Sequence, residues 1–80
     1  MVVTLLTRAY CHLCNDMRAA LAPLAARHGA RVEEIDVDSD AELETRWGEY
    51  VPVLLLGGRD GIEICHYTLD AGKLVAALRA

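Results

Sequence analysis

Hydrophobic residues along this chain occur either in continuous runs, which are typical of buried strands, or with the spacing of a helix. Residues 2–7 form an almost unbroken β-branched apolar run, which predicts a strand buried on both faces of a sheet. From Leu13 onward the apolar positions recur with helical period, and we expect that helix to end at Gly29. Pro23 lies inside this pattern and, because it cannot donate a backbone hydrogen bond, predicts a kink or a break.

The middle of the chain predicts a second strand followed by a short helix. Residues 31–37 alternate imperfectly between apolar and polar side chains, which favours a strand. Ser39 is followed three residues later by Glu42, and this spacing is that of a capping box. We therefore expect a short helix that starts at Ser39, continues to about Trp47 and is ended by Gly48.

The last third of the chain predicts a β-hairpin and a final helix. Residues 51–56 and 62–67 are strand-like, and a glycine-rich turn at 57–61 separates them. Strict alternation in the second of these strands would point Cys65 to the face opposite its apolar neighbours. Thr68 is the expected N-cap of the last helix.

The order of elements is therefore β-α-β-α-β-β-α, which places the chain in the α/β class. Alternating strands and helices imply a parallel pair with a right-handed crossover, and the hairpin adds two antiparallel strands. We expect a four-stranded mixed sheet with helices on both faces. With 80 residues the chain is long enough for one domain, spanning 1–80.

Composition and charge exclude several classes of function. Hydrophobic residues make up 54% of the chain and charged residues 25%, as in globular proteins. The formal net charge of −4 argues against a nucleic-acid-binding protein, which needs a basic face. No apolar run approaches the roughly 18 residues that span a membrane, and residues 1–7 do not resemble a secretory signal. We expect a cytoplasmic monomer, unless a signal was removed before Met1.

The chain has three cysteines, and their spacing carries the main chemical signal. Cys11 and Cys14 form a C-x-x-C motif after a predicted strand and at the start of a predicted helix. The free amides and the dipole of that helix end stabilise a thiolate, and a second cysteine one turn later can close a disulfide. Redox activity is the favoured interpretation. The alternatives are two structural cysteines, or a zinc site completed by Cys65 and by His12 or His66.

His12 and Cys65 have two interpretations each. An imidazolium at His12, between the cysteines, would stabilise the Cys11 thiolate and make the protein more oxidising. The alternative for His12 is an exposed polar residue at a helix start. Cys65 is expected to be a buried small residue, and the alternative is a third redox thiol.

With these features, the whole chain resembles the thioredoxin-fold family, and within it the short bacterial glutaredoxin-like proteins. The resemblance rests on the element order, on Cys11-His12-Leu13-Cys14 and on Tyr50-Val51-Pro52-Val53. It implies a thioredoxin-like fold in which Pro52 is cis and faces the disulfide. Val51 and Pro52 would then dock the backbone of a substrate beside Cys11, and Tyr10 would line the substrate groove.

The resemblance also bears on glutathione as a partner. Arg8 stands where glutaredoxins carry a basic residue that contacts a glutathione carboxylate, and it would also stabilise the Cys11 thiolate. However, the Gly-Gly clamp of glutaredoxins is replaced here by residues 64–67, and the pair at 57–58 lies in the hairpin turn instead. Asp70 is the nearest carboxylate for the γ-glutamyl amine. We therefore expect weak glutathione binding.

Together these observations predict a dithiol thiol–disulfide oxidoreductase that serves cell redox homeostasis and electron transport. Cys11 would attack the disulfide of a protein or a glutathione mixed disulfide, and Cys14 would resolve the intermediate. No cofactor or metal is required, and electrons would return from glutathione as cosubstrate or from a reductase. The alternatives are a redox-inert binding module of the same fold, and a protein that binds zinc or an iron–sulfur cluster through Cys11.

Overall fold

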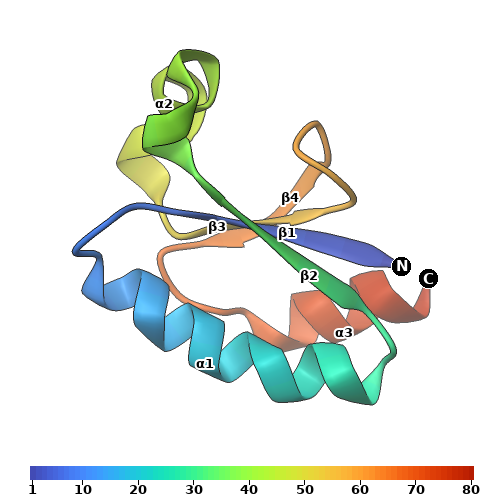
Figure 1. Cartoon of the computed structure of the whole chain (residues 1–80). Coiled ribbons are helices and arrows are strands. Elements are labelled where there is room, and N and C mark those ends of the chain that lie inside the picture. Colours follow the sequence, from blue (N-terminus) through green and yellow to red (C-terminus); the bar gives the residue numbers. More distant parts are fainter.

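The computed structural model describes residues 1–80 and contains the predicted order of strands and helices (Figure 1). The elements are β1 (Val2–Thr7), α1 (His12–Arg27), β2 (Arg31–Asp36), α2 (Ala41–Trp47), β3 (Val53–Leu56), β4 (Ile62–His66) and α3 (Ala71–Arg79). Two 3-10 helices, η1 (Val37–Ser39) and η2 (Gly48–Tyr50), flank α2. None of the helices is long and apolar enough to cross a membrane.

The four strands form one mixed sheet in the order β2-β1-β3-β4. β1 runs parallel to β2, whereas the β1–β3 and β3–β4 pairs are antiparallel. In the β1–β3 pair, Leu6 lies opposite Val53. Because the two strands run in opposite directions, the chain that leaves β1 lies beside the chain that enters β3. This register brings the C-x-x-C loop and Pro52 to the same end of the sheet.

Helices cover both faces of the sheet, as the sequence predicts. In Figure 1, α1 and α3 lie on one side of the sheet and α2 lies on the other. The core under α1 and α3 contains Val3, Leu5, Met17, Leu21, Ala25, Leu54, Ile64, Cys65 and Leu74. The smaller core under α2 contains Leu6, Val37, Leu43, Val53 and Leu55. Alternate residues of β1 therefore enter opposite cores, which explains why its sequence is apolar at nearly every position.

The expectation that Cys65 points to the face opposite Ile64 is wrong. Cys65 pairs with Leu54 and Glu63 pairs with Leu55, so Ile64 is an extra residue between two consecutive positions of β3. Such a β-bulge interrupts the alternation of side chains. Ile64 and Cys65 consequently enter the same core, where Cys65 is 6% exposed, and burial raises the pKa of its thiol. The expected burial of Cys65 is confirmed.

Both predicted helix caps are displaced along the chain. Ser39 lies in η1 and donates its hydroxyl to the Asp36 carbonyl, so it does not cap α2. Asp40 is the N-cap instead, and its carboxylate accepts hydrogen bonds from two amides of the first turn. Likewise Asp70, not Thr68, caps α3 by accepting from the amide of Lys73 at 3.0 Å. The capping-box pattern did not reveal the displaced cap of α2, because that pattern does not show that a preceding 3-10 turn uses the Ser39 hydroxyl.

Pro23 does not interrupt the first helix. Helix α1 runs from His12 to Arg27 with Pro23 inside it, so the predicted break is wrong. Pro23 is on the exposed side of the helix, as is Ala19, whose carbonyl would accept the missing bond. Water can satisfy that carbonyl, and the buried side of the helix retains its packing against the sheet.

Asp40 links the cap of α2 to the hairpin turn. Its second oxygen accepts a hydrogen bond from Arg59 at 2.7 Å. This interaction with Arg59 is the main reason that the pKa of Asp40 lies below its ordinary value of 3.8. The carboxylate therefore holds two segments that are 19 residues apart in the sequence.

We predict that Asp40→Asn destabilises the protein and that Asp40→Ala destabilises it more. Asparagine keeps an N-cap acceptor but loses the charge that pairs with Arg59, whereas alanine loses both. The charge effect is complete above the ordinary Asp pKa of 3.8 and is lost as pH falls through the lowered folded-state value. Urea unfolding from neutral to acidic pH should thus show the wild type and Asp40→Asn converging in acid. A gap that stays constant with pH would contradict the assignment.

Candidate active site

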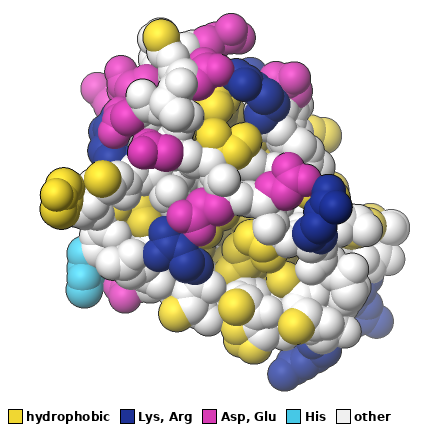
Figure 2. Space-filling model, viewed as in Figure 1, with side chains coloured by type: hydrophobic (Ala, Val, Ile, Leu, Met, Phe, Trp, Pro, Cys, Tyr) yellow, Lys and Arg dark blue, Asp and Glu magenta, His cyan; other side chains and the backbone are white.

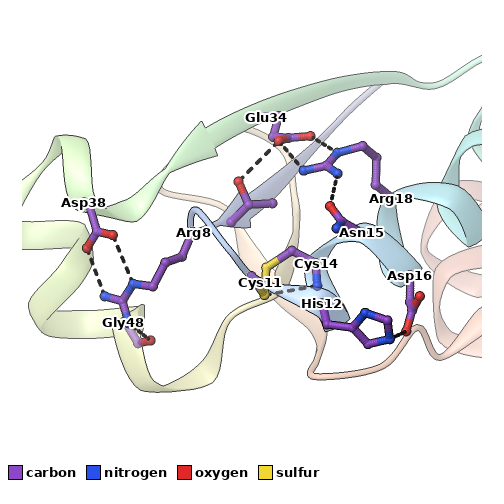
Figure 3. The surroundings of a disulfide bond; sticks show 11 residues. Arg8, Cys11, His12, Cys14, Asn15, Asp16, Arg18, Glu34, Asp38 and Gly48 are labelled. Atoms are coloured by element: carbon purple, nitrogen blue, oxygen red, sulfur yellow. Dashed lines mark hydrogen bonds and ion pairs between the residues drawn. A yellow bond between two sulfur atoms is a disulfide. The ribbon is translucent and has the colours of Figure 1, made fainter.

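Cys11 and Cys14 meet at the N-terminus of α1 and form a disulfide there (Figure 3). Their Cα atoms are 5.2 Å apart, a separation that one helical turn provides. Cys11 is the N-cap residue, with extended backbone (φ −103°, ψ 106°), and its sulfur accepts the Cys14 amide at 3.1 Å. The helix end therefore directs an otherwise unpaired N–H group at the Cys11 sulfur.

The two sulfurs differ in accessibility. Cys14 is 1% exposed and belongs to the buried side of α1. Cys11 is only partly buried and borders an open groove. A substrate can therefore reach Cys11 from solvent, while Cys14 can react only with a group that is already at Cys11.

Pro52 is cis, as the resemblance implies, and lies at the start of β3 next to the disulfide loop. The β-ladder begins at Val53, so Val51 and Pro52 precede it. The carbonyl of Pro52 accepts the amide of Tyr67 at 2.9 Å, and the Tyr67 hydroxyl donates to the Glu49 carbonyl at 3.1 Å. The end of β4 thus holds the Pro52 loop in place.

An aromatic cluster that sequence reasoning missed borders this loop. The Tyr67 and His66 rings are 4.7 Å apart, and the Tyr50 ring lies 5.6 Å from His66 and 6.5 Å from Tyr67. His66 pairs with Val53 in the sheet, so the residues before β3 and after β4 are neighbours. The predicted β-hairpin could have revealed this cluster, because its register places Tyr50 and Tyr67 at the same end of two paired strands.

A groove of about 430 Å³ opens on the other side of Cys11. Tyr10, which the sequence placed in the substrate groove, borders it, is fully exposed and has a positive φ of 58°. We call this space the polar groove, and its lining consists of Thr7, Arg8, Ala9, Tyr10, Cys11, Asn15, Arg18, Glu34 and Asp36. Arg18 makes two 2.7 Å hydrogen bonds to Glu34 across it, and this pairing is the main cause that lowers the pKa of Glu34.

The structure gives Arg8 a different role from the one expected. Its guanidinium points away from the disulfide and makes two hydrogen bonds to Asp38, at 3.1 and 3.0 Å (Figure 3). It also donates to Glu44 and to the carbonyl of Gly48, both at 3.1 Å. These three acceptors belong to η1, α2 and η2. Arg8 therefore joins the C-x-x-C loop to the segment that leads into Pro52, rather than presenting a free cation to a ligand.

The structure also places His12 and the residues considered as zinc ligands. His12 is 88% exposed and lies 3.6 Å from the Asp16 carboxylate, one turn along α1 and away from the sulfurs (Figure 3). Its tuning of the thiolate stays a prediction. No three His, Cys, Asp or Glu side chains converge on a point where they could hold a metal ion, so the zinc ligands that the sequence suggests are not assembled.

The sheet order, the disulfide at the start of α1 and the cis-proline opposite it define a protein of the thioredoxin-fold class. Mitochondrial thioredoxin 3 of Saccharomyces cerevisiae superimposes with a TM-score of 0.71 over 98% of this chain and 76% of its own, at 18% identity. At that identity the match concerns the fold.

Within this class the chain belongs to the glutaredoxin-like domain family (DUF836), whose model matches residues 2–79. Protein Ne2328 of Nitrosomonas europaea, solved by NMR, superimposes with a TM-score of 0.80 at 32% identity, covering 92% of this chain and 86% of its own. The uncharacterized protein Rv0508 of Mycobacterium tuberculosis is 40% identical over 79 residues, which are 92% of this chain and 78% of that protein.

We predict that Arg8→Ala loosens the segment before Pro52 without altering the Cys11 thiolate. Loss of the guanidinium removes hydrogen bonds to three elements at once, so amide hydrogen exchange around Gly48 and Val51 should become severalfold faster. Titration of Cys11 by alkylation should resemble the wild type. The control is Arg27→Ala, an exposed residue in the last turn of α1. Unchanged exchange with weaker thiolate formation would instead assign Arg8 the electrostatic role.

Proposed function

We propose that this protein is a dithiol thiol–disulfide oxidoreductase in which Cys11 is the nucleophile and Cys14 the resolving thiol. The observation that carries the proposal is the asymmetric disulfide at the helix start. Its outer sulfur, Cys11, caps α1 and accepts an amide hydrogen bond, while Cys14 is buried one turn further on. An accessible sulfur stabilised as a thiolate and a protected partner within bonding reach are the two requirements of dithiol exchange.

The reaction consists of two exchanges that transfer two electrons to the substrate. In the reduced protein, the Cys11 thiolate attacks one sulfur of a substrate disulfide, and the other substrate sulfur leaves as a thiolate that takes up a proton. The product is a mixed disulfide between Cys11 and the substrate. Cys14 then loses its proton and attacks the Cys11 sulfur. This step releases the second substrate thiol and forms the Cys11–Cys14 disulfide, which is the state in the structure.

Val51 and Pro52 support docking of the substrate in this proposal. They precede the ladder of β3, next to the disulfide loop. Pro52 is buried and Val51 is partly exposed, so an extended substrate segment can lie along the backbone at Val51 while Pro52 shapes the loop. Tyr10, on the opposite side of Cys11, borders the route by which a substrate approaches. Arg8 does not contact the substrate in this proposal; it positions the segment that carries Val51.

Reduction of the disulfide requires a thiol donor, either glutathione or a dithiol reductase. We propose that the donor acts in the cytoplasm, where thiols are kept reduced, and that the protein works as a monomer without a bound cofactor. Two other functions would suit the same fold: a redox-inert binding module, and a protein that binds an iron–sulfur cluster through Cys11. Neither of them needs the Cys11–Cys14 disulfide to form and break during turnover.

We predict that Cys11→Ser abolishes disulfide reduction, whereas Cys14→Ser accumulates a mixed disulfide between Cys11 and the substrate. The second variant keeps the attacking thiol but lacks the group that resolves the intermediate. Intact-mass spectrometry after mixing with a peptide disulfide measures the adduct. Cys65→Ser is the matched control, because Cys65 is a buried free thiol that takes no part in the disulfide, so its loss should leave turnover unchanged. Turnover by Cys11→Ser at the wild-type rate would refute the mechanism.

We also predict that Cys11 and Cys14 oxidise together in graded glutathione buffers. Their disulfide should form in one two-electron transition, with about 30 mV for each tenfold change in the ratio of oxidised to reduced protein. Mass spectrometry of alkylated protein follows each cysteine, and Cys65 should stay reduced because it is buried. Two thiols that remain reduced throughout would favour the redox-inert module, and a persistent glutathione adduct at Cys11 would contradict rapid resolution by Cys14.

A further inference from the structure

We propose that the substrates are polypeptide disulfides with an apolar side chain beside the reactive cysteine, and that this side chain docks in a groove between α1 and the β4–α3 connection. The inference rests on the dithiol chemistry proposed above. It adds the chemical class of the substrate and the surface that selects it.

The groove begins at the C-x-x-C motif, where Leu13 lines it. Leu13 lies between the two cysteines, and the groove continues along the same face of α1 past Met17 to Ala20. Tyr67 and Leu69, on the connection from β4 to α3, form the opposite wall. The space is about 200 Å³, and most of its lining is apolar. We call it the apolar groove.

Large apolar side chains are exposed mainly around this site. The chain exposes seven of them, and four lie in the C-x-x-C loop or beside the Pro52 loop: Tyr10, Leu13, Tyr50 and Tyr67. Leu13 is 41% exposed and Tyr67 is 44% exposed, and both line the apolar groove. Clustered exposed apolar side chains in a small protein mark a binding surface rather than a packing defect.

The charges near the disulfide disfavour an anionic ligand. The two arginines that line the polar groove with Cys11 are both bonded to carboxylates, Arg8 to Asp38 and Glu44, and Arg18 to Glu34. The apolar groove itself has a carboxylate at its rim, that of Asp16. Acidic side chains also gather over α2 (Figure 2), and the net charge is −4. A carboxylate-bearing disulfide such as that of glutathione would find these two guanidinium groups already paired and would be repelled by the nearby carboxylates, whereas an apolar polypeptide segment would not.

The test compares two capped peptides that have leucine or aspartate on both sides of one cysteine, each joined by a disulfide to 2-mercaptoethanol. Reduced protein releases the peptide thiol, which chromatography measures. The wild type should reduce the leucine peptide at least about tenfold faster in kcat/KM, as expected when a hydrophobic pocket is filled. The same preference should persist when glutathione replaces mercaptoethanol as the leaving thiol.

Ala20→Glu tests the groove, because it places a carboxylate on its wall at an exposed helical position that glutamate suits. It should remove most of the preference for the leucine peptide. Ala19→Glu is the matched control: it makes the same change one residue away, at an exposed position outside the groove, and should keep the preference. Equal effects of the two variants, or a wild type that prefers the aspartate peptide or shows no preference, would overturn the proposal.

The neutral disulfide of 2-mercaptoethanol separates this inference from the proposed function. It is too small to span from Cys11 into the apolar groove, so the wild type, Ala19→Glu and Ala20→Glu should all reduce it at the same rate. If none of them reduces it, the dithiol chemistry has failed. If all reduce it but the peptide preference is absent, the chemistry stands and the apolar groove is not the selecting surface.

Discussion

The pairing of β1 with β3 is the constraint on which the site depends. β1 is buried on both faces, and its antiparallel register with β3 sets Leu6 opposite Val53. Chain direction then requires that the loop leaving β1 and the loop entering β3 meet at one end of the sheet. The two halves of the site, the C-x-x-C at the start of α1 and the cis-proline at the start of β3, are brought together in this way although about 40 residues separate them.

Ion pairs hold the surface loops around this framework, and they also determine what the site offers to a ligand. Arg8 bonds to acceptors from η1, α2 and η2, and Arg59 joins the hairpin turn to Asp40. Because its bonds are internal, Arg8, the cation that the family resemblance assigns to ligand binding, is occupied by the protein's own carboxylates. Apart from the polar groove, the open surface near the C-x-x-C loop is aromatic and aliphatic, and Leu13 and Tyr67 are exposed on it.

The cap of α2 and the side-chain alternation in β4 differ from the expectation because of a shift of one residue along the chain. Ser39 has the spacing of a capping box, but its hydroxyl bonds within a 3-10 turn. Asp40 is therefore the N-cap of α2. Strict alternation, which would set Cys65 apart from Ile64, fails because a bulge adds one residue to β4. In both cases a local pattern is correct in kind and displaced by one residue, and local spacing alone does not reveal the displacement.

Local sequence was sufficient to predict the order of strands and helices, the burial of β1 and the placement of Cys11 and Cys14 at a helix start. These features follow from hydrophobic periodicity and from the interactions within one turn, which local sequence encodes. Three features could not be predicted from local sequence: the partners of Arg8, the aromatic cluster of Tyr50, His66 and Tyr67, and the groove beside Leu13. Each of these arises where strand register brings separate segments together, and a guanidinium or an aromatic ring contacts whichever group that register places within reach.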